Sequence, residues 1–452
     1  MAKQIVKLDD APLNKFHYKM TALTFGGHFT DGYVLGMIGI ALTLLTPQLD
    51  LSPFWVGLIG SSALIGIFLG SLILGRVSDL IGRQKVFALN FLIIILASIL
   101  QFFADSAIEL VVLRILIGFG LGGDYSVGHT MLAEILPRRH RGPILGSFSV
   151  IWTIGFVLAT VVGYSLLQVG PEAWRWMLSS AALPGLIIFI MRIGTPESPR
   201  WLVNQGRVDE ARQIVRKHIG QSIILDDETP VETKGNFADL FSKKMRKRTA
   251  FNCIFYLCIV LPYFAIYTFL PTILGIMGIN GNFGADLLLY VMLVIGSLLG
   301  ILFTIKLSTR AFLNGAFIFL SVSLLLLSLL PSGSSILMIT IFIAFTLIMS
   351  AVCNLTASIP PESFPTSHRS SGVGLATSFS RIGSAAGTFL LPISISNFGI
   401  QHSMLALTGV LIIGTIVSLA WAPETKSLSL DHASDTTNDQ ESSTKINTSG
   451  GA

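Results

Sequence analysis

Long apolar runs follow one another along most of this chain, separated by short polar segments. Their apolar positions are nearly continuous and do not alternate with period two, so the pattern predicts helices and argues against the strands of a barrel. A helix needs about 20 residues to cross the hydrocarbon of a bilayer. We therefore expect twelve membrane spans, near residues 19–46, 54–75, 84–104, 108–132, 144–168, 174–194, 250–275, 285–306, 311–330, 335–360, 371–396 and 402–422.

The composition indicates lipid as the solvent of these helices. Apolar residues make up 52% of the chain and charged residues 12%. Few soluble folds could bury that much hydrocarbon. The predicted fold class is an all-α membrane protein.

The second half of the chain repeats motifs of the first half. Residues 133–141 and 361–369 align at an offset of 228 positions, with Glu, Pro, His and Arg in register. Two pseudo-repeated six-helix bundles with a substrate site between them are typical of secondary transporters. We predict an N-terminal bundle at 1–194, a linker with amphipathic helices at 195–249, a C-terminal bundle at 250–430 and a disordered tail at 431–452.

Lysine and arginine are distributed unevenly between the loops. The N-terminal segment, the loops near 76–85 and 138–141, and the linker are basic, whereas the opposite loops carry almost no basic residue apart from Arg175. This asymmetry predicts a multi-pass membrane protein with both termini and the linker in the cytoplasm. The net charge of +5 is thus a topology signal, and we expect no nucleic-acid partner.

The linker contains a basic amphipathic segment at 208–217, which we expect to form a helix at the membrane surface. No nucleophile–base set, phosphate loop or metal-ligand spacing is visible, and the three cysteines lie inside apolar spans. We therefore expect no enzyme activity, no cofactor and no metal, and a monomer whose partners are the bilayer, protons and a small-molecule substrate.

Four ionisable residues lie well inside the predicted spans: Asp31, Arg114, Asp124 and Arg381. An unpaired charge costs several kcal/mol at the centre of a bilayer. Each of the four side chains should therefore face the interior of a bundle.

Three motifs carry a resemblance to a known family. The loop GRVSDLIGRQK at 75–85 resembles the signature loop of the major facilitator superfamily. The segments PESPRWL at 196–202 and PETK at 423–426 are similar to its sugar-porter branch, and above all to bacterial metabolite:proton symporters. The resemblance covers all twelve spans.

The resemblance implies roles for the charged residues near the cytoplasmic side. Two clusters would close this side in one state and part in another, since paired charges are inexpensive at an interface. The alternative is that these charges only fix topology and loop packing. The implied gate residues are Asp79, Arg83, Glu134, Arg141 and Glu197 in the first half, and Glu362, Arg369 and Glu424 in the second.

The resemblance also implies that Asp31 and Arg114 form a proton-coupling pair, in which protonation of the Asp removes its attraction for the Arg. A static buried salt bridge is the alternative. Asp124 follows a glycine-rich run similar to that of phosphate:proton symporters. It is either a second proton site, a substrate contact or a hydrogen-bonded structural carboxyl.

Arg381 lies about ten residues, or ~15 Å, from the cytoplasmic end of its span, near the bilayer midplane. A guanidinium there could bind a carboxylate with two hydrogen bonds. The alternative is a permanent pair with a protein carboxylate such as Asp31 or Asp124. His28 and His129 are either satisfied by single hydrogen bonds or part of a proton relay. Further candidates for the lining of the cavity are Tyr33, Tyr125, Trp152, Tyr263, Tyr267 and Asn354, which could equally pack against neighbours.

The substrate class follows from what the spans lack. Related sugar porters use glutamines and asparagines in spans five and seven, whereas residues 147–152 and 261–267 are mainly aromatic and aliphatic. A hydroxyl-rich ligand needs many convergent polar groups. We therefore predict a proton-coupled symporter of a small organic anion, such as a carboxylate or a sugar acid. The alternatives are a neutral sugar or polyol symporter and a non-transporting nutrient sensor.

Overall fold

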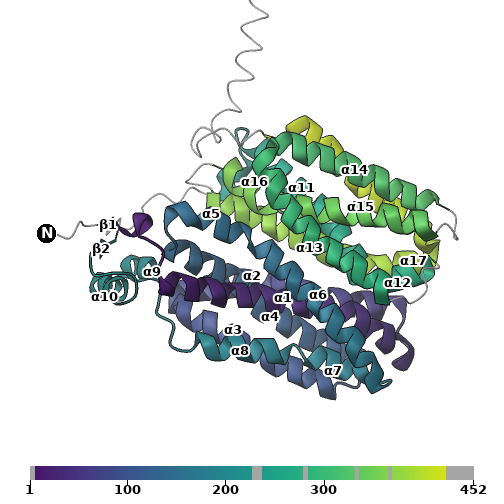
Figure 1. Ribbon diagram of the computed structural model, residues 1–452, viewed down its shortest axis with the longest axis horizontal. Helices are drawn as coiled ribbons and strands as arrows, with labels where there is room; N and C mark the ends of the chain where they lie inside the picture. The colour runs from purple at the N-terminus through teal and green to yellow at the C-terminus, as the bar shows by residue number, and fades with distance from the viewer. Residues whose placement is uncertain (1–5, 226–236, 278–282, 331–334, 365–368, 424–452) are drawn as a thin grey trace, which may run out of the picture. The chain divides into compact units, whose positions relative to one another are not determined.

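The computed structural model of the protein describes residues 6–225, 237–277, 283–330, 335–364 and 369–423. Its secondary structure is almost entirely α-helical (Figure 1). The helices of residues 6–194 are α1 (Lys15–Gln48), α2 (Pro53–Ile81), α3 (Arg83–Leu100), α4 (Ala107–Ile135), α5 (Arg138–Gly146), α6 (Phe148–Leu166), α7 (Ala173–Ser179) and α8 (Ala182–Arg192), with 3₁₀ turns at Leu8–Asp10, Gln101–Phe103 and Leu167–Val169.

The helices of the second half follow a 3₁₀ turn at Phe237–Phe241. The last of them, α17, contains the non-helical residue Gly399 with a φ of 78°, which separates two helical segments. They are α11 (Arg246–Thr268), α12 (Leu270–Ile276), α13 (Phe283–Lys306), α14 (Thr309–Leu329), α15 (Ser335–Cys353), α16 (Leu355–Ser363) and α17 (Arg369–Trp421).

These helices account for the twelve expected spans. Ten helices among the described residues are long and apolar enough to cross a membrane. The 29-residue α4 adds a further span, and Gly399 divides the last of the ten into two. The predicted all-α membrane fold with twelve spans is therefore confirmed.

Polar residues fix several helix ends. Asn14 caps α1, because its Oδ1 accepts from the backbone N–H groups of Phe16 and His17 at 3.0 and 3.1 Å. Ser106 caps α4 in the same way, through the N–H of Glu109. Gly82 ends α2 with a φ of 112°, a conformation that a residue with a Cβ rarely adopts.

The chain forms two compact units, and each is described by itself. After residue 231 the chain passes from one unit to the other within helices, namely within α11, α13 and α17. Unit 1 comprises residues 1–231, 265–291 and 388–396, and unit 2 comprises residues 232–264, 292–387 and 397–452.

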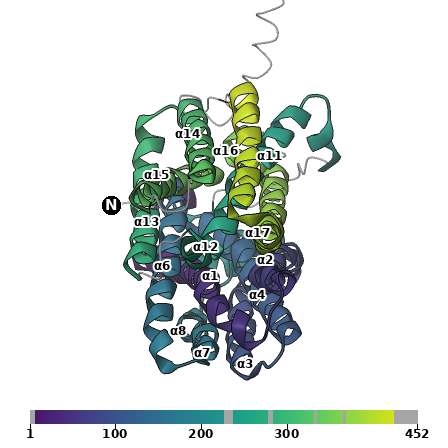
Figure 2. The same cartoon turned by 90° about the vertical axis from the view of Figure 1, so that its right-hand side faces the viewer.

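Within unit 1, α2 packs along α4 and α1 packs along α6, while α3 contacts α7 and α8 (Figures 1 and 2). The α2–α4 contact depends on glycine. A Cβ built on Gly118 would lie 2.0 Å from the carbonyl oxygen of Ala63 and 2.9 Å from the Cα of Gly66. The two backbones therefore touch, as they do where small residues line helix contacts in membranes.

We expect Gly118→Ala to lower the free energy of unfolding by about 1–3 kcal/mol, because the new methyl group collides with backbone that cannot move aside. The matched control is Gly409→Ala, since a Cβ on Gly409 meets no atom within 4 Å. That change should be neutral or stabilise by up to ~1 kcal/mol. Thermal unfolding in one detergent measures both, and equal midpoints for the two variants would contradict the contact.

A small subdomain at one end of unit 1 contains α9 (Pro199–Asn204), α10 (Val208–His218) and a parallel pair of strands (Figure 1). In the pair, β1 (Val6–Lys7) lies beside β2 (Ile223–Ile224), with Val6 opposite Ile223. The linker helix expected at 208–217 is confirmed.

Its expected position at the membrane surface stays a prediction. The apolar face of α10 is buried in the protein, where Ala211 and Val215 are 0% and 1% exposed and pack with Leu8, Trp201 and Leu202. The N-terminal segment and α9 thus cover this face. The expected tail at 431–452 lies outside the described residues.

Candidate functional site

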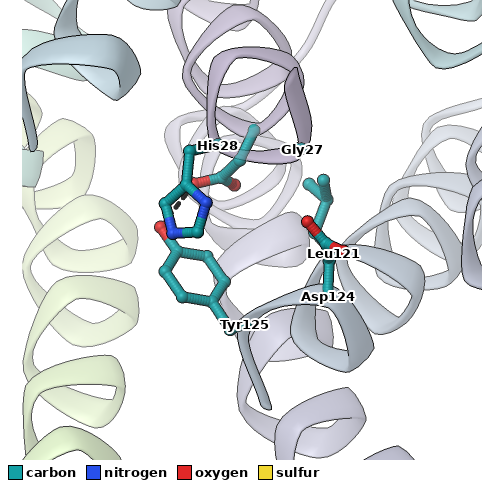
Figure 3. A pocket seen from close by; sticks show the side chains of 6 residues that line it. Gly27, His28, Leu121, Asp124 and Tyr125 are labelled. Atoms are coloured by element: carbon teal, nitrogen blue, oxygen red, sulfur yellow. Dashed lines mark hydrogen bonds between the residues drawn. The ribbon is translucent and has the colours of Figure 1, made fainter. Parts of the chain in front are cut away.

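A pocket lies between α1 and α4 in unit 1 (Figure 3). Both helices are buried over most of this length, so a polar side chain here must find its partners inside the bundle. The pocket brings together two of the four in-span charges that the sequence singled out. Its lining residues are Gly27, His28, Asp31, Leu121, Asp124 and Tyr125.

Asp31 is the carboxyl group at the centre of this arrangement, with 2% of its surface exposed. The hydroxyl of Tyr125 donates to its Oδ2 at 2.6 Å, and the indole Nε1 of Trp152 donates to the same atom at 2.5 Å. Three helices, α1, α4 and α6, therefore meet at one carboxylate oxygen. Two of the predicted cavity residues, Tyr125 and Trp152, are thus placed against Asp31.

The expected ion pair between Asp31 and Arg114 is absent from the described residues. Arg114 is 1% exposed and donates from Nε to the carbonyl oxygen of Ile59 at 3.0 Å, and no described carboxylate lies within 4.0 Å of its guanidinium nitrogens. The reason is the alignment of α1 with α4, in which Gly27 lies close to Asp124 and Gly128 lies close to Thr24.

These contacts show that α1 and α4 run in opposite directions, with Asp31 level with Leu121. Arg114 lies seven residues, or about 10 Å, further along α4, where it faces α2. The pairing inferred from the resemblance is therefore corrected for this structure: Tyr125 and Trp152, rather than Arg114, contact Asp31.

Asp124 is paired with a residue that the sequence reading missed. Arg192, at the end of α8, donates from Nη1 to Oδ1 of Asp124 at 2.5 Å, and the two side chains are 0% and 4% exposed. Arg192 also donates to the carbonyl oxygens of Phe87 and Leu23, both at 2.9 Å. Its guanidinium carbon lies 3.5 Å from the ring centroid of Phe87, a cation–π contact.

This geometry favours the structural alternative for Asp124, because the carboxylate holds α8 against α4 through a satisfied ion pair. The signal for Arg192 was present in the sequence. It lies inside the predicted span 174–194, close to its end, and was not named among the four charges inside the spans.

The other predicted cavity residues have separate partners. The Tyr33 hydroxyl lies 2.8 Å from the Ser180 hydroxyl in unit 1. In unit 2, Asn354 donates from Nδ2 to the carbonyl oxygen of Ser297 at 2.8 Å, so it joins α13 to the α15–α16 region. Tyr263 and Tyr267 are buried, at 6% and 1% exposed.

Arg381 belongs to unit 2, on α17. It is 8% exposed, and the side chains of Ser380 and Ser384 beside it are buried. Both serine hydroxyls bond to backbone carbonyl oxygens of their own helix, including that of Arg381. The structure therefore confirms a buried guanidinium in this apolar helix and small residues around it.

Four of the five expected gate residues of the first half lie together. Arg83 forms an ion pair with Glu134 and lies 3.8 Å from Asp79. Glu197 accepts from the backbone N–H groups of Arg83 and Gln84, both at 3.1 Å, so it caps the start of α3 from another segment. Ser198 donates to Glu134 at 2.5 Å.

Arg141, the fifth expected member, binds elsewhere. It donates to Asp9 at 2.6 Å, and Arg200 donates to the same Oδ1 at 2.9 Å. The N-terminal segment, which the sequence reading left out of the gate, therefore supplies the carboxylate for Arg141. Of the second-half residues, Glu362 is half-buried in α16. The side chain of Arg369 and the whole of Glu424 lie outside the described residues.

A third buried carboxyl was missed by the sequence analysis. Asp286 is 6% exposed and accepts a hydrogen bond from the hydroxyl of Tyr164, within unit 1. Its place at the very start of the predicted span 285–306 made it resemble a loop residue, although α13 begins three residues earlier.

Known proteins share this fold and sequence pattern. The profile of the family described as "Sugar (and other) transporter" matches residues 19–436. The inner membrane metabolite transport protein YgcS of Escherichia coli is 53% identical over 94% of this chain and 95% of its own length. The putative metabolite transport protein YaaU of the same organism is 38% identical over 95% and 97%.

A solved structure agrees in fold. The xylose transporter XylE of E. coli, in a partially occluded inward-open conformation, superposes with a TM-score of 0.75 at 19% identity, covering 92% of this chain and all of that chain. The twelve spans and these matches agree, and the chain belongs to the family of sugar and other transporters.

Proposed function

We propose that this metabolite transporter is a proton-coupled symporter of a small organic anion, a carboxylate or sugar acid, which works by alternating access. The orientation that goes with the proposal places both termini and the basic loops in the cytoplasm of a bacterial inner membrane. The protein acts as a monomer and carries out no covalent chemistry on its cargo.

Asp31 supports the proton part of the proposal. It is a buried carboxyl whose two neutral donors, Tyr125 and Trp152, both bond to Oδ2. A proton added to Oδ1 would leave both of these hydrogen bonds in place. Protonation would remove a buried negative charge, which suits a group that loads and releases a proton in each cycle.

The buried guanidinium of Arg381 is the observation that carries the anion part. A planar guanidinium binds a carboxylate with two parallel hydrogen bonds. Neutral sugars instead need many convergent polar groups. In the first half, the polar side chains at the Asp31 pocket are two carboxyls, a histidine and a tyrosine, without the amides expected for a sugar.

The charge cluster of Arg83, Glu134 and Glu197 serves as half of the cytoplasmic gate in this proposal. Each of its charges is satisfied by the others or by backbone N–H groups. Opening would exchange these contacts for contacts with water. The ion pairs of Asp9 add the N-terminal segment to the same cytoplasmic layer.

A neutral sugar is the second candidate, because XylE is described as a proton:xylose symporter and this chain shares its fold. A thermal-shift screen of the purified protein against sugar acids, aromatic carboxylates and neutral sugars separates the two candidates. Stabilisation by carboxylates and not by sugars supports the anion proposal, and the reverse result overturns it.

We expect Arg381→Ala to weaken binding of the stabilising carboxylate by about 10- to 100-fold, the value of a hydrogen-bonded charge. Arg381→Lys keeps the charge without the planar fork, and should recover part of the affinity. Calorimetric titration of the carboxylate measures both. Retained affinity in Arg381→Ala would contradict the assignment even if transport were impaired.

A further inference from the structure

Two histidines of unit 1 meet ring to ring beside the Asp31 pocket. His28 lies on α1 one turn before Asp31, and His129 lies on α4 one turn after Tyr125. Their Nε2 atoms are 3.1 Å apart, a hydrogen-bond distance. Figure 3 shows His28 above the ring of Tyr125, on the wall of the pocket.

The other nitrogen of each ring has a partner that can only accept. His28 Nδ1 lies 3.1 Å from the carbonyl oxygen of Thr24, and His129 Nδ1 lies 2.8 Å from that of Tyr125. A carbonyl oxygen has no proton to donate, so each Nδ1 must carry its own. Each helix thus fixes the protonation of its own histidine, through the residue four positions earlier.

This arrangement leaves the two Nε2 atoms facing each other. If both rings were neutral, both Nε2 atoms would present lone pairs at 3.1 Å, and no hydrogen bond would form. If both were imidazolium, two N–H groups and two positive charges would oppose each other. One proton between the two atoms satisfies both rings.

We propose that His28 and His129 together bind one proton between their Nε2 atoms, as a second proton site beside Asp31. The pair carries one positive charge, with one ring an imidazolium and the other neutral. This inference rests on the proposed proton coupling for its role in transport, but the binding of the proton itself does not depend on it.

The surroundings suit one positive charge. The ring of Phe148 on α6 stacks on His28 with centroids 4.2 Å apart and 8° between the planes, and its face attracts a cation. Among the described residues of unit 1, the titratable side chains that line the pocket with His28 are Asp31, Asp124 and Tyr125. Arg192 of α8 forms an ion pair with Asp124, and Asp31 brings a further carboxyl group to the pocket.

The positions of the two sites suggest an order of transfer. Both histidines are displaced from Asp31 toward the ends of α1 and α4 that bear Lys15 and Ile135, the ends next to the basic loops. A proton that leaves Asp31 toward this side meets the histidine pair first. The pair would first release its own shared proton toward the cytoplasm and would then receive the proton from Asp31.

The test is ¹⁵N spectroscopy of the full chain in detergent, with histidine labelled on both ring nitrogens. At pH 7 we expect the Nε2 signals of His28 and His129 to lie between the positions of protonated and unprotonated nitrogen. In His129→Gln, the Nε2 of His28 should move fully to the unprotonated position, and His28→Gln should do the same to His129. His402→Gln is the control, because His402 is exposed on α17 and should change neither signal.

Either of two results overturns the proposal. The first is that both rings are neutral, with one of them protonated on Nε2 instead of Nδ1. The second is that the signals of each histidine stay unchanged when the other histidine is replaced. If a variant does not fold, the wild-type titration decides. A shared site takes up its protons in two separated steps, whereas independent rings titrate together.

Uptake into liposomes under a pH gradient is measured separately. If the shared-proton signals are present but uptake does not depend on the proton gradient, the proposed symport is wrong and the proposed histidine site stands. Independent rings with normal proton-driven uptake would remove only the histidine site.

Discussion

Asp31→Asn should abolish accumulation driven by a proton gradient. With one proton per cargo molecule, an imposed difference of two pH units sustains about 100-fold accumulation, since each pH unit is worth ~1.4 kcal/mol. The asparagine keeps the size of the side chain and an acceptor oxygen for Tyr125 and Trp152, but it binds no proton. The internal concentration should therefore stop near the external one.

The measurement is uptake of the carboxylate found by thermal shift, in proteoliposomes with an imposed pH gradient. Exchange of labelled for unlabelled cargo without a gradient should persist in the variant, because it needs no net movement of protons. Asp50→Asn changes an exposed aspartate at the end of the same helix and should behave as wild type. Full accumulation by Asp31→Asn would show that the coupling proton binds elsewhere.

Arg192→Ala should be the most destabilising of the substitutions considered. It leaves the carboxylate of Asp124 buried without its cation, and breaking a buried pair in this way costs about 3–5 kcal/mol. It also removes the hydrogen bonds to the carbonyl oxygens of Phe87 and Leu23. Unfolding of the purified protein in detergent, followed by circular dichroism, gives the loss.

The double variant Asp124→Asn with Arg192→Met tests the cause of that loss. It removes both charges and keeps most of the volume, so much of the stability should return. Arg207→Ala is the control, because its pair with Glu210 on α10 is exposed to solvent and contributes little to stability. A loss in Arg192→Ala no larger than in Arg207→Ala would mean that the ion pair does not stabilise the fold.

The expected helices were predictable because membrane insertion depends on local composition. A run of about 20 apolar residues can be identified as a membrane span without knowing which other segments pack against it. The break at Gly399 was visible for the same reason, as the gap between the runs 371–396 and 402–422. The packing of α10 could not be predicted, because its partners Leu8 and Trp201 come from other segments of the chain. From the sequence alone, its apolar face had no identified partner.

The site could be predicted as a set of residues but not as a set of contacts. Asp31 and Asp124 were identified from the sequence as charges inside the spans, and Tyr125 and Trp152 as candidates for the lining of the cavity. The structure brings Asp31 to Tyr125 and Trp152. The partner of Asp124 was missed because Arg192 lies at a span end. The partner assigned to Asp31 was wrong because Arg114 lies about 10 Å too far along α4.

The sequence by itself determined that this chain is a twelve-span helical protein with a few charges inside its bundles. The reason is that a continuous run of apolar residues is enough to place a helix in the hydrocarbon of a bilayer. Only the tertiary structure decided which charge meets which partner. A hydrogen bond requires two atoms within ~3 Å, and that distance depends on the relative height and rotation of helices far apart in the chain. The histidine pair shows the difference: two residues 101 positions apart become one site because α1 and α4 run in opposite directions.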